Sequence, residues 1–559
     1  MGGTFTECFP WKMQIRRKHG TFRAGLKSLV VEYCSESSVH GVHYFRGSER
    51  TWYEKLVWIL VFALSVGSCF WLIHEVYHKW SDTPVIVSFA EKSTPVWQIP
   101  FPAITICPEV KTSYGEMNFT RQYLNYVGKS AGEQRHDNGT DSLLAIMQLC
   151  ERSIYDRLLN QSQPFPDKIS GESYGSIIRR MKIPLKEIVL YCSFQNSWIP
   201  CEQLFSYTMT DEGVCVTFNA LSASDMLRKE NLTPLEPYLS ENKPSEHWTQ
   251  DGGYTAQSDL DSYPYRALRP GQLAGLKVVL RSDRRNHDFL CRGALRGFKA
   301  LLHPNNEYPQ LTSQFVRIPM NQDVNIAVKP QIITTTPGLH HYSPERRQCF
   351  FNHERYLQFF REYTQDNCEL ECLTNFTLSH CGCVRFSMPR NGTTPECETN
   401  QMECMMGAEQ RYLEMDFRSR RGDEPINYHD DCNCLPGCAS VQYDLEITQT
   451  DFDWKGWLQN LNRSTRSADD GIELALFEVY YKEAQFMTSK RSELYGLTDF
   501  LANCGGLLGL CMGVSLLSLV ELVYFCVVRP VTLWRQRREQ VNEEEQSQGI
   551  SMVARDNDN

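Results

Sequence analysis

Residues 505–528 read GGLLGLCMGVSLLSLVELVYFCVV, an apolar run in which Glu521 carries the only charge. As a helix this run is about 36 Å long, enough to cross a bilayer. Gly505, Gly509 and Gly513 stand four residues apart, so a continuous helix places them on one face, where other helices can approach closely. Glu521 at membrane depth is costly unless it faces water or a partner. A glycine face for dimerising an inert anchor is one interpretation, and the glycine spacing and Glu521 set the run apart from a plain anchor.

A second uncharged run, residues 56–73 (LVWILVFALSVGSCFWLI), also has the length of a membrane-spanning helix. It lies too far into the chain, and is too long, for a cleavable signal peptide. Residues 1–55 contain nine Lys/Arg and five Asp/Glu, a net charge of about +4, and the flank after residue 528 opens with arginines. Because positively charged flanks stay in the cytoplasm, we predict two spans with both ends inside and a large acidic loop outside.

The cysteines and the glycosylation sequons test that topology independently. Sixteen of the 22 cysteines lie between the two spans, an even number typical of disulfides in an oxidising compartment. Zinc ribbons are the alternative for spacings such as Cys432-x-Cys434, but they do not fit a glycosylated loop. The N-x-S/T sequons all lie in the same loop, at Asn118, Asn138, Asn160, Asn231, Asn375, Asn391 and Asn462. We therefore predict that the loop is extracellular.

Local patterns predict a mixed α and β structure for this loop. Runs rich in branched and aromatic residues predict strands at residues 85–89, 101–107, 276–280, 298–303 and 476–482. Residues 354–373 have helical character, which places Cys368 and Cys372 on one face. Disulfides then brace residues 349–438, a region too small for a core of its own. The last strand leads toward the second span, so a force on the braced region passes into the glycine-faced helix.

Several motifs, each weak by itself, occur together in a specific order. A His-Gly pair precedes the first span, FPAITIC follows it, a cysteine ladder fills the loop, and Gly-Val-Ser followed by a glutamate lies in the second span. This set resembles the degenerin/epithelial sodium channel superfamily, which includes acid-sensing channels. Residues 342–350 (YSPERRQCF) and 496–506 (GLTDFLANCGG) are similar to its arthropod pickpocket branch. The resemblance covers roughly residues 30–530.

The resemblance implies an α+β membrane protein. Two transmembrane helices flank a large disulfide-rich extracellular domain of palm, finger and thumb, and three subunits surround a central pore. The implied parts are a cytoplasmic N-terminus with the His-Gly gating motif (1–55), transmembrane helix 1 (56–73), an extracellular Cys-rich domain (74–498, with the thumb at about 349–438), the pore mouth with transmembrane helix 2 (499–528) and a cytoplasmic tail (529–559).

The same resemblance assigns roles to individual residues. Glycine carbonyls can approach an ion closely, and a serine can add an oxygen or cap a broken turn. Asp499 falls at or within one residue of a gating site where small side chains are usual, so an acid there is a departure. The implied residues are Gly513, Val514 and Ser515 for the selectivity filter, His40, Gly41 and Asp499 for gating, and Gly505, Gly509 and Glu521 for the pore lining.

The disulfide pairs are also implied by the resemblance. Cys150 and Cys291 remain after the family's pairs, and we predict that they form an eighth bridge. Tyr77 and Trp80 are candidates for an aromatic contact that couples the ectodomain to the pore, or are ordinary interfacial aromatics. The implied pairs are Cys107–Cys215, Cys192–Cys201, Cys349–Cys438, Cys368–Cys434, Cys372–Cys432, Cys381–Cys404 and Cys383–Cys397.

We therefore predict a sodium-selective, amiloride-sensitive cation channel of the plasma membrane, sensory or epithelial, with Na⁺ as the permeant ion. Its partners would be related subunits, in a homo- or heterotrimer, and membrane lipid. One alternative is a subunit that conducts only in a heteromer. Another is a two-span surface receptor or adhesion protein, suggested by Arg421-Gly422-Asp423. No nucleophile–base set or metal spacing indicates an enzyme, and we expect no cofactor, no metal and no nucleic acid. The stimulus stays open.

Overall fold

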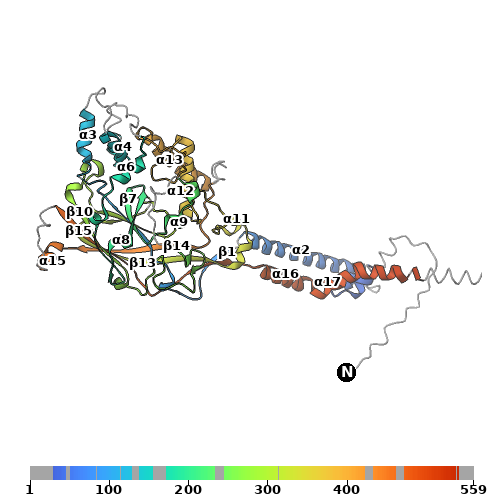
Figure 1. Ribbon diagram of the computed structural model, residues 1–559. Helices are drawn as coiled ribbons and strands as arrows, with labels where there is room; N and C mark the ends of the chain where they lie inside the picture. The colour runs from blue at the N-terminus through green and yellow to red at the C-terminus, as the bar shows by residue number, and fades with distance from the viewer. Residues whose placement is uncertain are drawn as a thin grey trace, which may run out of the picture. The chain divides into compact units, whose positions relative to one another are not determined.

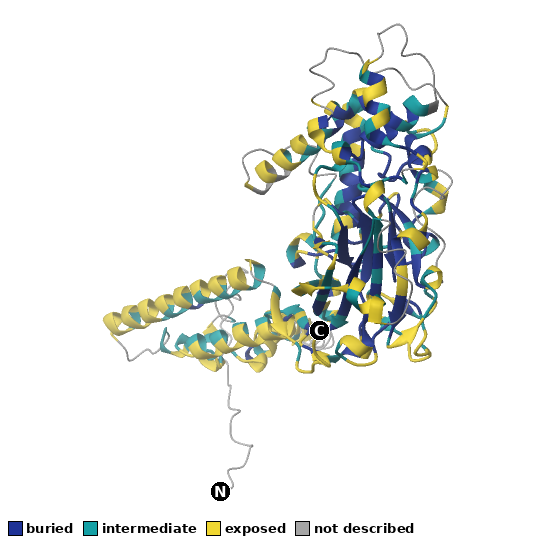
Figure 2. Cartoon of the chain, turned by 90° about the vertical axis from the view of Figure 1, so that its left-hand side faces the viewer, coloured by how far each residue is buried: buried dark blue, intermediate teal, exposed yellow. Residues whose placement is uncertain are grey.

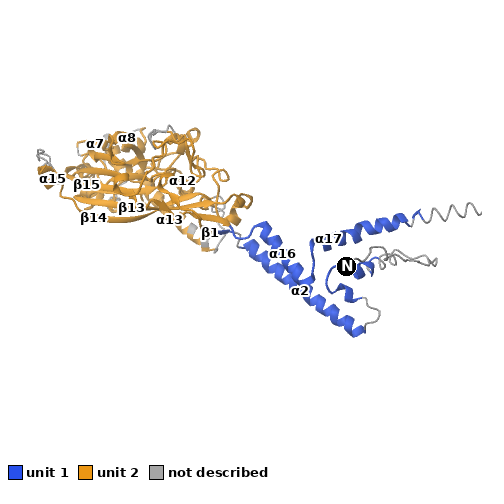
Figure 3. Cartoon of the chain, turned by 90° about the horizontal axis from the view of Figure 1, so that it is seen from below, with its two compact units in different colours: residues 1–86, 493–559 blue, residues 87–492 orange. Residues whose placement is uncertain are grey.

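The computed structural model divides into two compact units (Figure 3), residues 1–86 with 493–559 and residues 87–492. The sequons at Asn160 and Asn462 lie outside the described residues, as do Gly422 and Asp423. The residues that the structure describes are 29, 31–45, 51–82, 85–113, 115–128, 138–154, 156, 171–232, 244–312, 314–421, 432–460, 471–536, 538 and 539.

The unit of residues 87–492 is built on two main β-sheets (Figure 1). In the larger sheet, the long strand β13 pairs in parallel with β15 and β17 and antiparallel with β14. Its order is β1(Val85–Phe89), β17(Ser489–Glu493), β13(Gln322–Thr335), β15(Ile472–Tyr481), β10(Leu276–Asp283), β4(Val189–Phe194), β5(Ser197–Trp198), with β14(Ser440–Asp451) beside β13. The smaller sheet is β12(Val316–Ile318), β11(Phe298–His303), β3(Ala103–Pro108), β7(Gly213–Phe218), β6(Phe205–Thr210). Short pairs are β16(Gln485–Phe486) with β2(Thr94–Pro95) and β8(Trp248–Thr249) with β9(Gly253–Tyr254).

The two main sheets share one apolar core (Figure 2). Every residue of β3 is buried, as expected for a strand covered on both faces. Ile104 and Val216 of the smaller sheet and Val278, Ile326 and Phe477 of the larger sheet belong to the same buried cluster. The five predicted strands are confirmed, with small shifts at their ends.

Helices lie around these sheets and form cores of their own. The helices α3(Phe119–Gly128), α4(Asn138–Met147) and α6(Tyr174–Arg180) lie together in Figure 1 and supply most of one cluster. The helices α12(Gln365–Cys381) and α13(Met402–Arg421) contact each other, and α12 contributes to a third cluster. Shorter helices are α7(Leu185–Ile188), α8(Cys201–Leu204), α9(Ala223–Met226), α10(Phe289–Arg292), α11(Pro344–Arg347) and α15(Trp454–Asn460).

The helix predicted for residues 354–373 begins later than expected. Residues 354–364 form a loop, because backbone N–H groups there bind side chains instead of helical carbonyls. The Glu371 carboxylate accepts hydrogen bonds from the N–H groups of Gln358 (2.8 Å) and Phe359 (2.9 Å). The helix starts only after Thr364, whose hydroxyl caps it by accepting from the N–H of Asn367.

Disulfides brace this unit throughout. Within the described residues, the sixteen cysteines between the spans are bonded in the pairs that the resemblance implies, and Cys150 bonds to Cys291 as predicted. The bridges are Cys107–Cys215, Cys150–Cys291, Cys192–Cys201, Cys349–Cys438, Cys368–Cys434, Cys372–Cys432, Cys381–Cys404 and Cys383–Cys397.

A buried ion network adds polar links near the smaller sheet. The Glu212 carboxylate accepts from Lys111 (2.9 Å), Arg292 (2.8 Å) and Lys299 (2.6 Å). Burial opposes the ionisation of Glu212, but these three cations outweigh it and hold the pKa of Glu212 well below its ordinary value. Arg292 also binds Glu109, whose pKa is lowered in the same way.

The other unit holds the membrane-spanning segments. The helix α2(Trp52–Asp82) contains the predicted first span, and most of its residues are exposed, as expected for a helix in lipid. It packs against α16(Leu497–Met512). A further helical stretch, residues 516–536, comprises α17(Leu516–Val523), the π-helical turn η9(Tyr524–Val528) and the residues that follow.

The second span is therefore not the continuous helix predicted for residues 505–528. It breaks between α16 and α17, and Gly513 ends α16 instead of sharing a helix face with Gly505 and Gly509. The prediction was wrong because uniform apolar composition hides a glycine that adopts a non-helical conformation.

Candidate functional site

The break in the second span is set by a glycine and two serines. Gly513 has φ 66°, the left-handed conformation that glycine adopts without strain, and its N–H bonds back to the carbonyls of α16. Ser515 then caps α17. Its hydroxyl accepts from the N–H of Ser518 (3.3 Å), and the Ser518 hydroxyl accepts from the N–H of Ser515 (3.1 Å). Both ends at the break are thus stabilised inside an apolar span.

The segment before the first span lies against this break. The N–H of His40 donates to the carbonyl of Met512 (2.9 Å), the last residue of α16. The His40 imidazole lies so close to Gly513 that a Cβ there would overlap it. Gly41 has φ 90°, and the 3₁₀ turn η1(Val42–Phe45) follows it. The predicted gating pair and the predicted filter are therefore in contact.

Aromatic contacts hold η1 against α2. The Tyr44 ring stacks on Trp58 with centroids 4.1 Å apart, and Phe45 meets Phe62 edge-on at 5.4 Å. A Cβ on Gly41 would come within 3.2 Å of the Phe62 ring, a tighter approach than most Cβ atoms make. Glycine thus provides both the turn and the room at this position.

Ser38 joins the N-terminal segment to the second span below the break. Its N–H and its hydroxyl both donate to the Glu521 carboxyl group, at 3.1 and 2.9 Å. The hydroxyl oxygens of Ser38 and Ser518 are 2.7 Å apart, and Ser518 is 3% exposed. The single charge in the span is thus bound to a partner in the chain.

Counting hydroxyl protons gives these bonds a direction. Each hydroxyl has one proton, and the proton of Ser38 goes to Glu521. Ser518 must therefore donate to Ser38, and Ser515, 3.3 Å away, must donate to Ser518. The chain of donors runs from Ser515 to Glu521. It turns the Ser515 proton toward Ser518 and leaves an oxygen lone pair of Ser515 for another ligand.

A second contact joins an earlier part of the N-terminal segment to the end of the second span. Arg529 pairs with Glu32, with Nη2 and Oε1 2.6 Å apart, and the rings of Tyr33 and Phe525 meet at 5.5 Å. Sequence reasoning missed this pair because the two charges are nearly 500 residues apart in the chain. The basic residue after the span was read only as a topology signal.

The outer half of the second span carries the remaining predicted residues. The Asp499 carboxylate accepts from the N–H of Gly496 (3.1 Å) and so caps the start of α16. Phe500 meets Trp80 of α2 with ring centroids 5.2 Å apart, and Tyr77 at 6.4 Å. These two predicted aromatics thus contact α16, through a residue that sequence reasoning did not single out.

Gly505 lies away from the break on α16, whereas the Gly509 carbonyl accepts from the N–H of Gly513 at the break (2.9 Å). A Cβ on Gly505 would meet nothing within 4 Å, and one on Gly509 would meet only the Val514 carbonyl at 3.8 Å. The structure thus brings His40, Gly513, Ser515 and Glu521 into one connected site, which Gly509 joins through its carbonyl and which does not include Gly505. Ser38 and Ser518 complete the site and were missed. The Ser-x-x-Ser spacing of Ser515 and Ser518 is a capping signal that could have found one of them.

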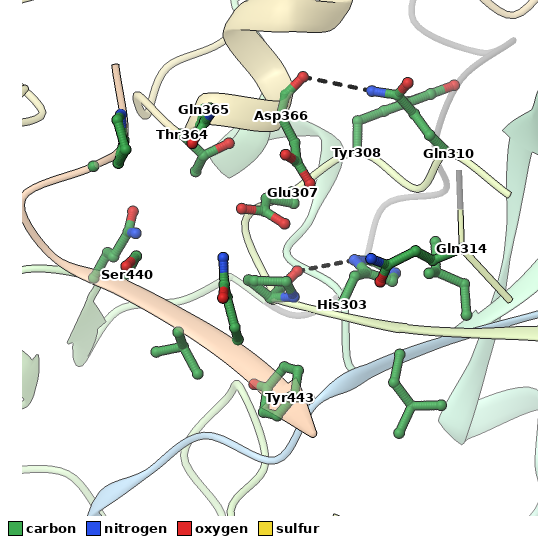
Figure 4. A pocket seen from close by; sticks show the side chains of 18 of the residues that line it. His303, Glu307, Tyr308, Gln310, Gln314, Thr364, Gln365, Asp366, Ser440 and Tyr443 are labelled. Carbon is green, nitrogen blue, oxygen red and sulfur yellow. Dashed lines mark hydrogen bonds between the residues drawn. The ribbon is translucent and has the colours of Figure 1, made fainter. Parts of the chain in front are cut away.

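A separate polar cavity of about 430 Å³ lies in the unit of residues 87–492 (Figure 4). Glu307 and Asp366 both line this cavity. Burial and then the Asp366 charge raise the pKa of Glu307 well above its ordinary value. The sequence had left open which carboxylates meet.

Comparison with known proteins gives a consistent result. The family model described as amiloride-sensitive sodium channel matches residues 33–525. Pickpocket protein 28 of Drosophila melanogaster is 28% identical over 531 residues, covering 92% of this chain and 81% of its own. Sodium channel protein Nach of the same species is 23% identical over 522 residues, covering 92% and 89%. Acid-sensing ion channel 1A of Danio rerio is 21% identical over 502 residues, covering 88% and 86%.

Proposed function

Because the chain belongs to the amiloride-sensitive sodium channel family, we propose that it forms a sodium-selective pore whose filter is Gly513-Val514-Ser515. The family consists of ion channels, not enzymes. The observation that carries the proposal is the break in an apolar span, where Gly513 is left-handed and Ser515 caps the next helix. Non-helical backbone at membrane depth is tolerated where it lines a cavity.

The chemistry of the break suits a small cation. Backbone carbonyls and hydroxyls replace part of the water shell of an ion in a selectivity filter. Gly513 and Val514 supply carbonyl oxygens between the two half-helices, and Ser515 adds a hydroxyl whose proton is turned toward Ser518. Three copies around an axis would close the ring, and the open face at Gly505 and Gly509 gives other helices room to pack or line the pore.

The N-terminal segment is the proposed gating element. His40 contacts Gly513 and bonds the Met512 carbonyl, so a movement of the segment changes the filter directly. Glu521 acts through Ser38 and also offers a negative charge to cations on the inner side. Asp499 lies at the outer end of α16, where its charge would raise the local concentration of cations.

The proposed setting is the plasma membrane, with both termini in the cytoplasm and residues 87–492 outside. Basic flanks and the sequons support this orientation. The proposed partners are other copies of the chain or related subunits, in a trimer, and lipid. A subunit that conducts only with partners is the second candidate, because its pore residues would look the same.

The test is whole-cell current from this chain alone, opened without knowledge of the stimulus. Asp499→Trp adds bulk near the pore mouth, and Asp499→Ala removes the same helix cap without bulk, which separates the two effects. We expect a steady inward Na⁺ current, blocked by amiloride, from Asp499→Trp. We also expect that adding Ser515→Ala changes the Na⁺/K⁺ permeability ratio, whereas adding Cys526→Ser does not.

The outcomes separate the candidates. An unchanged ratio across several Ser515 substitutions would show that the filter lies elsewhere. Surface expression without current, followed by current on co-expression with a related subunit, would establish the heteromeric candidate. Surface expression that stays silent in both conditions would contradict conduction and favour a receptor role.

A further inference from the structure

The C-terminal end of α2 carries two histidines at a spacing that suits a metal ion. Residues 74–78 read HEVYH and lie inside the helix. His74 and His78 are four residues apart, so they share one helix face. Their imidazole rings are neighbours, with centroids 6.0 Å apart. Two histidines at this spacing on a helix are a ligand pair of zinc sites.

A carboxylate already orients one of the two rings. The Nδ1 atom of His78 lies 2.5 Å from the Asp82 carboxylate, one turn further along α2. A histidine that binds a metal through one nitrogen donates its other N–H to such a group, which fixes the ring and strengthens the ligand. Because Asp82 occupies Nδ1, the Nε2 atom of His78 is the nitrogen left for an ion. Both side chains stay accessible, with 64% and 54% of their surfaces exposed.

Glu75 supplies a third ligand. It precedes His78 by three residues, and a Glu-x-x-His pair on one helix supplies ligands to the metal sites of helix bundles. Glu75 and His74 are both exposed, so their side chains can turn toward a shared ion without disturbing a packed core. Tyr77 and Trp80, in contrast, meet α16 through their rings. The ligand face of α2 therefore lies away from the contact between the two spans.

We propose that His74, Glu75 and His78 bind a divalent transition-metal ion of the class of Zn²⁺, with water as the fourth ligand. Two histidines, one glutamate and a water make up a four-coordinate zinc site. Imidazole nitrogens favour such ions over hard ions such as Ca²⁺, which take oxygen ligands. The carboxylates of Glu75 and Asp82 together balance the charge of the ion. Zinc proteases use the same spacing, but the chain belongs to a channel family, so we assign binding and not catalysis.

Such an ion would join two successive turns of α2 and stiffen the part of the helix that carries Tyr77 and Trp80 against Phe500. The expectation of no metal did not account for this site, because the predicted span ends at residue 73 and the structure extends the helix to Asp82. This inference goes beyond the proposed function, since binding requires the folded end of α2 and not conduction. Its test is therefore direct metal binding, with no current in the readout.

The experiment uses the purified full-length chain, without a polyhistidine tag, and Zn²⁺ as the probe. Zinc bound per chain is measured over a range of free Zn²⁺ for the wild type, His74→Ala, His78→Ala and the matched control His341→Ala, which removes an exposed histidine of the other unit. We expect one tight site in the wild type and in the control, and an affinity weaker by about 10-fold or more in the other two variants. Equal affinity in all four proteins would overturn the proposal.

Two further measurements test the carboxylates and guard against misfolded variants. We expect Glu75→Gln and Asp82→Asn each to weaken Zn²⁺ binding by about 10-fold, since each removes a negative charge beside the ion. An affinity unchanged in Glu75→Gln would overturn the three-ligand site. In wild-type membranes we also expect Zn²⁺ to protect His74 and His78, but not His341, from modification by diethyl pyrocarbonate. Equal modification with and without Zn²⁺ would contradict the proposal.

Discussion

Glu307 in the polar cavity has a raised pKa, and this makes stability depend on pH. A carboxyl group with a raised pKa binds a proton in the folded state that the unfolded chain has already released. Its stabilising effect is therefore full below the ordinary Glu pKa of 4.5 and is lost as the pH rises through the raised value. A rise in pH therefore weakens the interaction of Glu307 with Asp366 in the first turn of α12.

We expect Glu307→Gln to flatten this dependence. Glutamine keeps a hydrogen-bond donor toward Asp366 but cannot ionise. The midpoint of thermal unfolding of the wild type should fall as the pH rises above 4.5, and that of the variant should fall less. Glu345→Gln, at an exposed position, is the control. Parallel curves for the wild type and Glu307→Gln would show that the pKa of Glu307 is not raised on folding.

The buried ion network makes a second prediction at a single residue. Glu212→Gln leaves Lys111, Arg292 and Lys299 without their shared carboxylate. Removing one partner of a buried ion pair costs about 3–5 kcal/mol of stability. The exposed pair of Lys186 and Glu202 provides the control, because Glu202→Gln should cost only about 0–1 kcal/mol. Chemical denaturation compares the two, and similar losses would contradict the role assigned to Glu212.

The broken second span shows what local sequence patterns could and could not predict. Strands such as β11 were predicted to the residue, because alternating or buried apolar runs are local signals. The break at Gly513 was missed, since a glycine in a uniformly apolar run looks like a packing residue. The Ser38–Glu521 contact joins positions 483 residues apart, and no local pattern contains it. The disulfide pairs came from the family resemblance and not from spacing.

The break between α16 and α17 predicts that alanine at position 513 reduces the current far more than alanine at position 505. Alanine at position 513 would be strained, by about 1–2 kcal/mol in the left-handed conformation, and its methyl would overlap His40. Alanine at position 505 meets open space within the chain. We expect Gly513→Ala to abolish most of the current of a channel opened by Asp499→Trp, with surface expression kept, and Gly505→Ala to retain more. Equal currents would contradict the role of the break.

The chain of serine hydroxyls predicts that the N-terminal segment affects selectivity. Ser38→Ala removes hydroxyl bonds to both Glu521 and Ser518. Because one hydrogen bond contributes about 0.5–1.5 kcal/mol, we expect the Na⁺/K⁺ permeability ratio to fall about 2- to 10-fold. Ser35→Ala is the matched control, since its hydroxyl binds only the nearby Glu32 carbonyl among the contacts described. An equal Na⁺/K⁺ permeability ratio in Ser38→Ala and Ser35→Ala would show that Ser38 does not act on the proposed filter.

For the whole molecule, the proposed topology requires that residues 87–492 pass through the secretory pathway. Asn391 is a suitable probe, because its side-chain carbonyl accepts from Thr393 and Thr394 and leaves the amide nitrogen for a glycan. We expect Asn391→Gln to migrate faster on a denaturing gel by one glycan, and the difference to disappear after glycosidase treatment. A wild-type chain that glycosidase does not shift would contradict an extracellular ectodomain.

The link between Ser38 and Glu521 also sets an order of events during biogenesis. At about 5–20 residues per second, a ribosome needs roughly 25–100 s to make the 483 residues between them. Throughout that time the N-terminal segment has α2 to pack against but not α16 and α17 of the second span. The ectodomain can fold and oxidise first, and the proposed filter is assembled only when the last spanning segment is released. A nonsense codon anywhere in the ectodomain therefore yields a chain that has its proposed gating segment and lacks the proposed pore helix.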